Sequence, residues 1–336
     1  MREGLGTLLW QLYHPEIPAF LEELSQTPPM HRLRDVGMDC GCEYTKFPRF
    51  VKIGPYSRYD HSLGAALIVW HFTGSREQAA AALFHDAATP VFAHVVDFLN
   101  GDHLRQESTE TGTGALLAAS PAVSALLEKY GLTVEQVEDY HRYPIADNAS
   151  PALSADRLEY TLGDLLHYGF AEVEEVAAFY QDLTVGEDEQ GRPELAFRTR
   201  EVAAGFARLA LCNSRVYVAD EDRFAMETLA GILHLALDRG VLRREELWTT
   251  ETDVIERLRR EAVCGRVWER FCGYSHVLRS KERPTGERDW IRVDAKKRWI
   301  DPLVVGEGRV SSLDADLRQE IEAFLRMDLG GWLKGG

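Results

Sequence analysis

The chain has 336 residues, of which 45% are hydrophobic and 27% are charged, and its formal net charge is −16. This length and composition are ordinary for a globular protein with one large domain or two modest ones. The acidic excess repels nucleic-acid phosphates, so a long DNA or RNA partner is not expected, although a metal and a few basic residues in a cleft can still bind a small anion.

Two properties of the chain predict a cytoplasmic location. No apolar run approaches the roughly 20 residues that a helix needs to cross a bilayer, and the N-terminal stretch shows no small-residue cleavage site, so neither a membrane partner nor a signal peptide is expected. The five cysteines are odd in number and scattered, and no second pair follows Cys40-Gly-Cys42 at a zinc-site spacing. We therefore expect free thiols in a reducing compartment.

The spacing of apolar residues predicts a mainly α fold. Caps are expected at Ser75, at Ser154 and at Thr133, where Gln136 three residues later completes a capping box. In chain order, the predicted helices cover 62–72, 76–86, 89–100, 108–130 with a break near Pro121, 132–141, 155–168 closed by Gly169, 201–215, 219–239, 251–271 and the stretch from Ser312.

Two stretches predict small β elements. Residues 183–197 have apolar ends around a charged turn that contains glycine, which indicates a hairpin. Residues 289–305 alternate and contain a turn-like Asp-Ala-Lys-Lys. We expect a helical domain over residues 1–275, with a C-terminal β-hairpin and helix over 276–336 packed on it.

The apolar helical stretch 58–89 contains His61 and, 24 residues later, the doublet His85-Asp86, whose side chains are of types that bind metals. Neutral imidazole and carboxylate groups suit Fe, Mn, Zn, Co or Ni and do not single one out. The alternative is that these are core histidines whose nitrogens found hydrogen bonds.

A second set of polar residues lies farther along the chain. Asp156, Tyr160, Asp164 and His167 are spaced to share one helical face beside a stripe of leucines. This pattern is typical of either a cleft lining or a solvated face.

Two shorter features carry charge. His94 and Asp97 are three residues apart, so the carboxylate can orient the ring and raise its pKa for proton transfer, unless the two form a surface ion pair. The cluster Lys296-Lys297-Arg298 can face the phosphates of a substrate or occupy a solvated β-turn.

These residues resemble the HD superfamily of metal-dependent phosphohydrolases, and in particular its dNTP triphosphohydrolase-like branch. The resemblance covers roughly residues 30–170. It rests on three motifs, Arg58-Tyr59-Asp60-His61-Ser62-Leu63-Gly64, the block Leu83-Phe84-His85-Asp86 with Phe92-Ala93-His94, and the helix Asp156-Arg157-Leu158-Glu159-Tyr160 with Asp164.

The resemblance implies a fold, an activity and a role for each matched residue. The fold is an HD-domain helical bundle, and the activity is hydrolysis of a phosphate ester, most often of a nucleotide or deoxynucleotide. A divalent metal (Mn, Fe, Co, Ni, Zn or Mg) is bound by four ligands, and helical members of the family often form homo-oligomers. The implied metal ligands are His61, His85, Asp86 and Asp156, the implied catalytic residues are His94, Asp97 and Arg58, and the implied substrate contacts are Arg58, Arg157, Tyr160 and Asp164.

Two positions depart from the family's pattern. Thr89 stands where relatives carry a second His, and the downstream His-Glu motif is matched only by Gln106-Glu107-Ser108-Thr109, with His103 close by. Both departures concern substrate binding and proton transfer rather than the four ligands. They leave open a second function, that of a regulatory module that binds metal or nucleotide without turnover.

Overall fold

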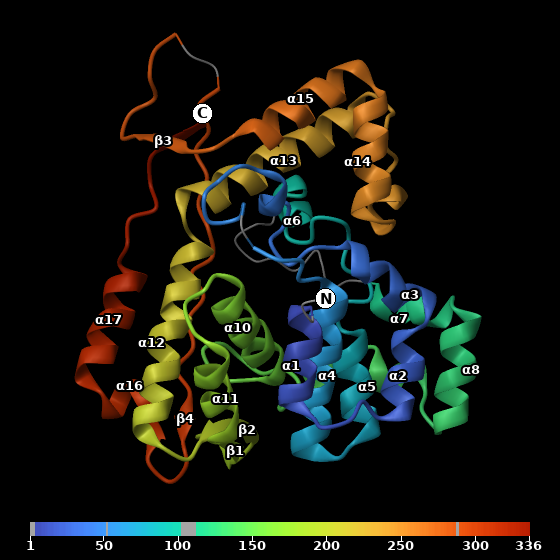
Figure 1. Ribbon diagram of the computed structural model, residues 1–336, viewed down its shortest axis with the longest axis vertical. Coiled ribbons are helices and arrows are strands. Elements are labelled where there is room, and N and C mark those ends of the chain that lie inside the picture. Colours follow the sequence, from blue (N-terminus) through green and yellow to red (C-terminus); the bar gives the residue numbers. More distant parts are fainter. Residues whose placement is uncertain (1–3, 52, 102–111, 287–288) are drawn as a thin grey trace.

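The computed structural model describes residues 4–51, 53–101, 112–286 and 289–336, and over these ranges the predicted mainly α class with small β elements is confirmed (Figure 1). Along the first part of the chain the helices are α1 (Leu5–Tyr13), α2 (Ala19–Ser25), α3 (Pro28–His31), α4 (Arg58–Thr73), α5 (Arg76–Phe84), α6 (Val95–Leu99), α7 (Thr113–Ala118), α8 (Pro121–Tyr130) and α9 (Val134–Val137). They continue with α10 (Ala155–His167), α11 (Val173–Gln181), α12 (Arg200–Val216), α13 (Asp220–Asp238), α14 (Glu251–Arg260), α15 (Ala262–Gly273), α16 (Val310–Leu313) and α17 (Ala315–Leu325). The strands are β1 (Leu183–Glu187), β2 (Pro193–Phe197), β3 (Val277–Ser280), β4 (Leu303–Val304), β5 (Gly308–Arg309) and β6 (Trp332–Gly335).

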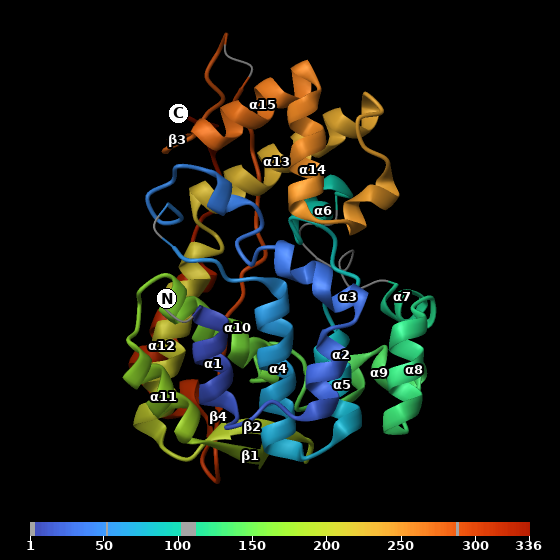
Figure 2. The same cartoon turned by 45° about the vertical axis from the view of Figure 1, so that its right-hand side comes forward.

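The buried apolar side chains form two clusters. The first core is built mainly by α1, α2, α4, α5, α8, α10, α11, α12 and α17. The second core is built by α6, α13, α14 and α15 together with residues 40–50. Figure 2 shows α6 and α13–α15 gathered at one end of the molecule.

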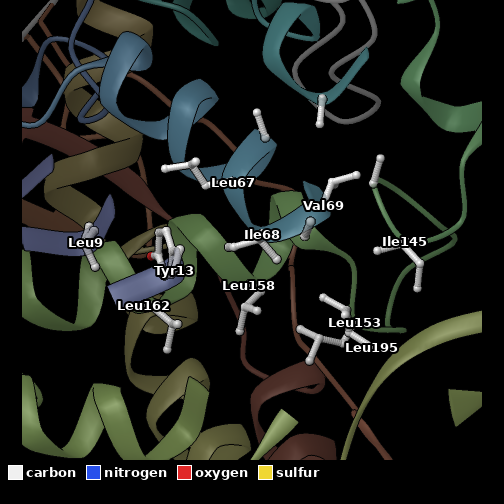
Figure 3. Packing of buried hydrophobic residues seen from close by; sticks show 14 of the residues in the cluster. Leu9, Tyr13, Leu67, Ile68, Val69, Ile145, Leu153, Leu158, Leu162 and Leu195 are labelled. Atoms are coloured by element: carbon white, nitrogen blue, oxygen red, sulfur yellow. The ribbon is translucent and has the colours of Figure 1, made fainter. Parts of the chain in front are cut away.

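Helix α4 is central to the first core. It begins with a capping box, in which the Ser57 hydroxyl accepts from the Asp60 N–H at 3.2 Å and the Asp60 carboxylate accepts from the Ser57 N–H at 3.0 Å. Helix α4 packs against α1, α5 and α10, and this packing buries residues 63–69. Figure 3 shows Ile68 of α4 and Leu158 of α10 in this packing.

Several predicted helices agree with the structure, but the helix predicted over 89–100 is limited to Val95–Leu99 and the helix predicted over 132–141 to Val134–Val137. The caps at Ser75, Thr133 and Ser154 are confirmed, because each residue makes the expected hydrogen bond at the start of its helix. The single helix predicted over 251–271 is wrong. Glu261 has an extended backbone with ψ of 129°, and its side chain caps α15 by accepting from the N–H groups of Val263 and Cys264, so two helices form instead.

The hairpin predicted over 183–197 is confirmed, with Leu183 opposite Phe197 in an antiparallel pair. Within 276–336, β4 and β5 form a short antiparallel pair, β4 also pairs in parallel with β2, and β3 pairs with β6. Most of the segment 289–302 forms no strand, and other groups bond to its backbone. The Val293 carbonyl accepts from Arg223, and the Asp301 N–H donates to the Pro151 carbonyl.

The division of the chain at residue 275 stays a prediction. Buried side chains from the C-terminal stretch enter both cores, with Val293 and Leu333 in the second and Ile300 and Phe324 in the first. The stretch thus contacts both parts of the molecule.

The five cysteines are free thiols, as expected. None of the helices in the described ranges has both the length and the apolar character of a bilayer-spanning helix.

Candidate functional site

Three helices bring predicted ligand residues to one cavity of about 160 Å³. His61 lies in the first turn of α4, His85 directly follows α5, and Asp156 lies in the first turn of α10. Of the residues predicted from the sequence, those that line the cavity are Arg58, His61, His85, Asp86, His94, Asp156, Tyr160 and Asp164. Asp97 and Arg157 are not among the lining residues.

The nitrogen and oxygen atoms of the cluster converge closely. His61 Nε2 lies 3.0 Å from Asp156 Oδ1 and 3.2 Å from His85 Nε2. His85 Nε2 lies 3.6 Å from Asp86 Oδ2, and the candidate ligand atoms of His61, His85 and Asp86 all lie within 4.8 Å of one another. His61, His85 and Asp86 thus form one compact group, and Asp156 Oδ1 lies beside both rings, 3.0 Å from His61 Nε2 and 3.5 Å from His85 Nε2.

Hydrogen bonds fix the orientation of both imidazole rings. His61 Nδ1 lies 2.6 Å from Glu159 Oε2, and His85 Nδ1 lies 2.7 Å from the Ala82 carbonyl oxygen. Because both partners only accept, each Nδ1 carries a proton, and Nε2 is the atom left for a ligand bond. Two Nε2 atoms beside two carboxylates form a donor set that fits a divalent metal ion.

Glu159 is the residue of this cluster that the sequence did not single out. It lies three residues after Asp156 on α10, is fully buried, and also accepts a hydrogen bond from the Tyr56 hydroxyl at 2.6 Å. A carboxylate that holds the second nitrogen of a metal-binding His is a recurring feature of metal sites. The sequence signal that could have identified Glu159 is an acidic residue within the leucine-rich face of α10.

The carboxylates around His61 produce a negative electrostatic potential, which attracts positive charge. Burial would lower the pKa of His61, but its hydrogen bonds with Asp156 and Glu159 outweigh burial and raise the pKa to about 10. A proton and a metal ion compete for the same Nε2 lone pair. The carboxylates that favour the proton therefore favour a metal cation at the same place.

Asp86 is held by two donors. Arg58 Nη1 donates to Oδ2 at 2.9 Å, and the Thr89 hydroxyl donates to Oδ1 at 2.6 Å. Burial would raise the pKa of Asp86, but Arg58 and the neighbouring histidines hold it well below its usual range. Thr89 thus has a defined task, the orientation of a candidate ligand.

Comparison with known proteins finds distant relatives of this chain. No protein-family model matches the chain. The uncharacterized protein YdhJ of Bacillus subtilis (strain 168) is 26% identical over 256 residues, which cover 76% of this chain and 75% of that protein. The metal-dependent phosphohydrolase cns2 of Cordyceps militaris is 25% identical over 202 residues, which cover 60% of this chain and 54% of that protein.

A crystal structure of a phosphohydrolase from Bacteroides thetaiotaomicron superposes with a TM-score of 0.62 at 15% identity, covering 95% of this chain and 96% of the other. The two chains share a fold.

His94 and Asp97 form a buried pair beside the cluster. His94 Nδ1 lies 2.8 Å from Asp97 Oδ2, Asp97 is fully buried, and the His94 side chain is 25% exposed and lines the cavity. Burial lowers the pKa of His94, and the hydrogen bond with Asp97 does not offset it. The neutral ring donates from Nδ1 and presents Nε2 as a proton acceptor.

The backbone that leads to His94 is strained. Phe92 and Ala93 have φ of 57° and 47°, in the left-handed region that costs energy for residues with a side chain. The Phe92 N–H donates at 3.1 Å to Oε1 of Glu251, a buried carboxylate. This bond helps to hold the turn in place.

The remaining predicted substrate contacts differ in position. Tyr160 and Asp164 line the cavity, and the Tyr217 hydroxyl donates to Asp164 at 2.5 Å. Burial raises the pKa of Asp164 to about 7 despite this bond. The guanidinium of Arg157 instead donates to the Ala152 carbonyl at 2.7 Å and pairs with Asp147 at 3.1 Å.

Three cavity residues come from the far end of the sequence, Ala295, Lys296 and Arg298. The segment 292–300 forms no turn, Arg298 is half-buried, and Lys296 lines the cavity while it also remains exposed to solvent. His103 and the stretch 106–109, the nearest match to the downstream family motif, lie outside the described residues.

Proposed function

We propose that this protein is a metal-dependent phosphohydrolase and that its substrate is a nucleotide or deoxynucleotide. The convergence of His61, His85, Asp86 and Asp156 in one cavity carries the proposal. The Cordyceps militaris relative is named a metal-dependent phosphohydrolase, and this name supports the same reaction class.

These four residues would hold the metal, with Glu159 and Ala82 fixing the two imidazole rings from behind. A bound divalent metal supplies a hydroxide at neutral pH and polarises a phosphoryl oxygen. The chain itself shields both imidazole rings from bulk solvent, since His61 is 1% exposed and His85 is 8% exposed.

Two further groups act on the phosphate. Arg58 lines the cavity, and its charge can neutralise the phosphoryl oxygens while Asp86 holds its position. His94 exchanges a proton with the substrate through Nε2. A phosphate dianion bound beside the ring would raise its pKa, which favours proton donation to the leaving oxygen.

The nucleotide assignment rests on the walls of the cavity. They include the aromatic rings of Tyr140, Tyr160, Tyr168 and Tyr217. Aromatic rings pack well against the planar rings of other groups, and phenol hydroxyls can bond to a sugar or a base. A nucleotide combines such groups with the phosphate that the metal cluster requires.

Removal of a ligand tests the metal. Asp86→Ala is expected to abolish both bound metal, measured by elemental analysis of the purified protein, and all hydrolysis. Asp86→Asn, which keeps the side-chain shape beside Arg58, guards against loss of folding. His71→Ala is the control, because His71 is an exposed histidine on α4, the helix that also carries His61. Activity that survives in the Asp86 variants would refute the assignment.

A substrate screen tests the reaction. Phosphate release is measured from dNTPs, NTPs, nucleoside monophosphates and cyclic dinucleotides, with Mn, Fe, Co, Ni or Mg supplied. Turnover of at least one nucleotide class is expected. Metal binding without phosphate release from any of them would instead indicate the regulatory module.

A further inference from the structure

Residues 289–302, which lead to β4, run from the end of the molecule near β3 toward the opposite end (Figure 1). Ala295, Lys296 and Arg298 of this segment line the same cavity as His61 and Asp156. The cavity is therefore closed by residues more than a hundred positions away from the ligand helices.

The segment is fixed on both sides of these residues. Before them, the Val293 carbonyl accepts from the guanidinium of Arg223, which is fully buried and also donates to the Leu329 carbonyl at 2.8 Å. After them, the Ile300 side chain is buried in the first core, and the Asp301 N–H donates to a carbonyl oxygen at 2.9 Å. These anchors fix where Lys296 and Arg298 lie without help from a ligand.

Neighbouring residues of the segment serve different purposes. Lys297 is not among the cavity-lining residues, and its Nζ donates to the carbonyls of Leu325 and Met327, each at 2.6 Å, at the end of α17. Cations stabilise the carbonyl end of a helix in this way. Lys297 thus has a structural role at the end of α17, whereas Lys296 and Arg298 lie at the cavity.

The cavity needs positive charge that Arg58 alone does not supply. Arg58 is already paired with Asp86 at 2.9 Å, and the cavity is also lined by Asp156 and Asp164. The two carboxylates of Asp86 and Asp156 balance the charge of a bound divalent metal, so a phosphate dianion that enters beside them needs further cations. Arg298 is near enough to the reaction centre for its charge to contribute to the lowered pKa of His94, after the larger effect of burial.

We infer that Lys296 and Arg298 bind the phosphate of the substrate, with Arg298 as a two-pronged donor to its oxygens. The inference rests on the proposed phosphohydrolase function and adds residues that the motifs of the first 170 positions do not contain. Planar guanidinium groups match phosphate oxygens in pairs, and an ammonium adds a point charge.

The test compares three single variants, Lys296→Gln, Arg298→Gln and Lys297→Gln, which each remove one charge from the same segment. Inorganic phosphate is titrated into the metal-loaded proteins by calorimetry, and kcat and KM are measured with the best substrate of the screen. We expect Arg298→Gln to weaken phosphate binding and kcat/KM by roughly 10- to 100-fold and Lys296→Gln by about 3- to 10-fold, as for lost charge-assisted hydrogen bonds. Lys297→Gln is expected to stay within about twofold of the wild type.

Metal content separates this inference from the proposed function. The metal content of all three variants should equal that of the wild type, and Arg298→Lys should recover part of the loss by restoring the charge. Phosphate binding that is unchanged in both Lys296→Gln and Arg298→Gln, or absent from the wild type, overturns the inference. Phosphate binding that weakens as expected in a protein that cleaves no ester supports the anion site and refutes the proposed function.

Discussion

Replacing Glu159 with Gln tests whether a buried carboxylate behind His61 determines metal affinity. Glu159 Oε2 accepts from His61 Nδ1 and from the Tyr56 hydroxyl, each at 2.6 Å, and the side chain is fully buried. Gln retains the shape, and its one oxygen can take the place of Oε2 and accept from both His61 and Tyr56. The substitution therefore changes mainly the charge.

The expected effect follows from the bond that is weakened. A hydrogen bond to a charged group contributes about 1.5–3 kcal/mol against about 1 kcal/mol for a neutral pair, so about 1–2 kcal/mol of metal binding is lost. That corresponds to a roughly tenfold rise in the Kd for Mn²⁺, within the range of about 10- to 100-fold typical of residues that hold a ligand. The metal-free protein should not lose stability, because burial raises the pKa of Glu159 and Gln carries no charge to bury.

Calorimetric titration of Mn²⁺ into the metal-free protein measures the Kd, and thermal unfolding without metal measures stability. Tyr56→Phe is the matched control, since it removes the other hydrogen bond to the same oxygen but leaves the carboxylate. An unchanged Kd in Glu159→Gln, or an equal loss in Tyr56→Phe, would refute the reasoning.

Three further predictions concern stability. Gly64→Ala should lower the free energy of unfolding by about 1–3 kcal/mol, because a Cβ there would lie 2.4 Å from Glu159 Oε1, and the Kd for Mn²⁺ should rise as that carboxylate moves. Ser57→Ala should cost about 1 kcal/mol through loss of the cap of α4. Burial raises the pKa of Glu251 from 4.5 to about 7. Between pH 4.5 and 7 the folded protein therefore keeps a proton on this group that the unfolded chain has lost. The free energy of unfolding falls as the pH rises from 4.5 to 7. In Glu251→Gln the free energy of unfolding should no longer show this decrease with pH, which amounts to at most about 3 kcal/mol in the wild type.

Urea unfolding measures all three, with the last repeated between pH 5 and 8. Gly64→Ala at wild-type stability would show that α4 and α10 can move apart at no cost. Ser57→Thr should keep the cap, so an equal loss in both Ser57 variants would point to another cause. A stability profile that Glu251→Gln leaves unchanged would mean that the carboxyl group titrates normally in the folded protein.

Local signals in the sequence predicted α4, α5, α8, α10, α12 and α17 of the first core but not α1, α2 or α11, and eight of the predicted site residues line the cavity. Ser75 and Ser154 cap their helices because capping depends on neighbours within three residues. The four predicted metal ligands converge because the apolar spacing of α4, α5 and α10 fixes which faces pack together.

Other features depend on contacts that no local pattern records. The side chain of Glu261 splits the helix predicted over 251–271, a choice between two conformations that differ little in propensity. Arg157 is in the family motif, yet its guanidinium bonds to the loop before its own helix. Glu159 and Arg298 are ordinary charged residues until tertiary packing places one behind His61 and the other at the cavity.

The cavity draws its parts from both cores. His61, His85 and Asp156 stand on helices of the first core, whereas His94 and Asp97 lie among Val91–Leu99 of the second. The distance between the candidate metal ligands and His94 is therefore set by how the two cores sit against each other, and not by the packing inside either one. Partial unfolding that opened only the second core would displace His94 but leave His61, His85 and Asp156 in place.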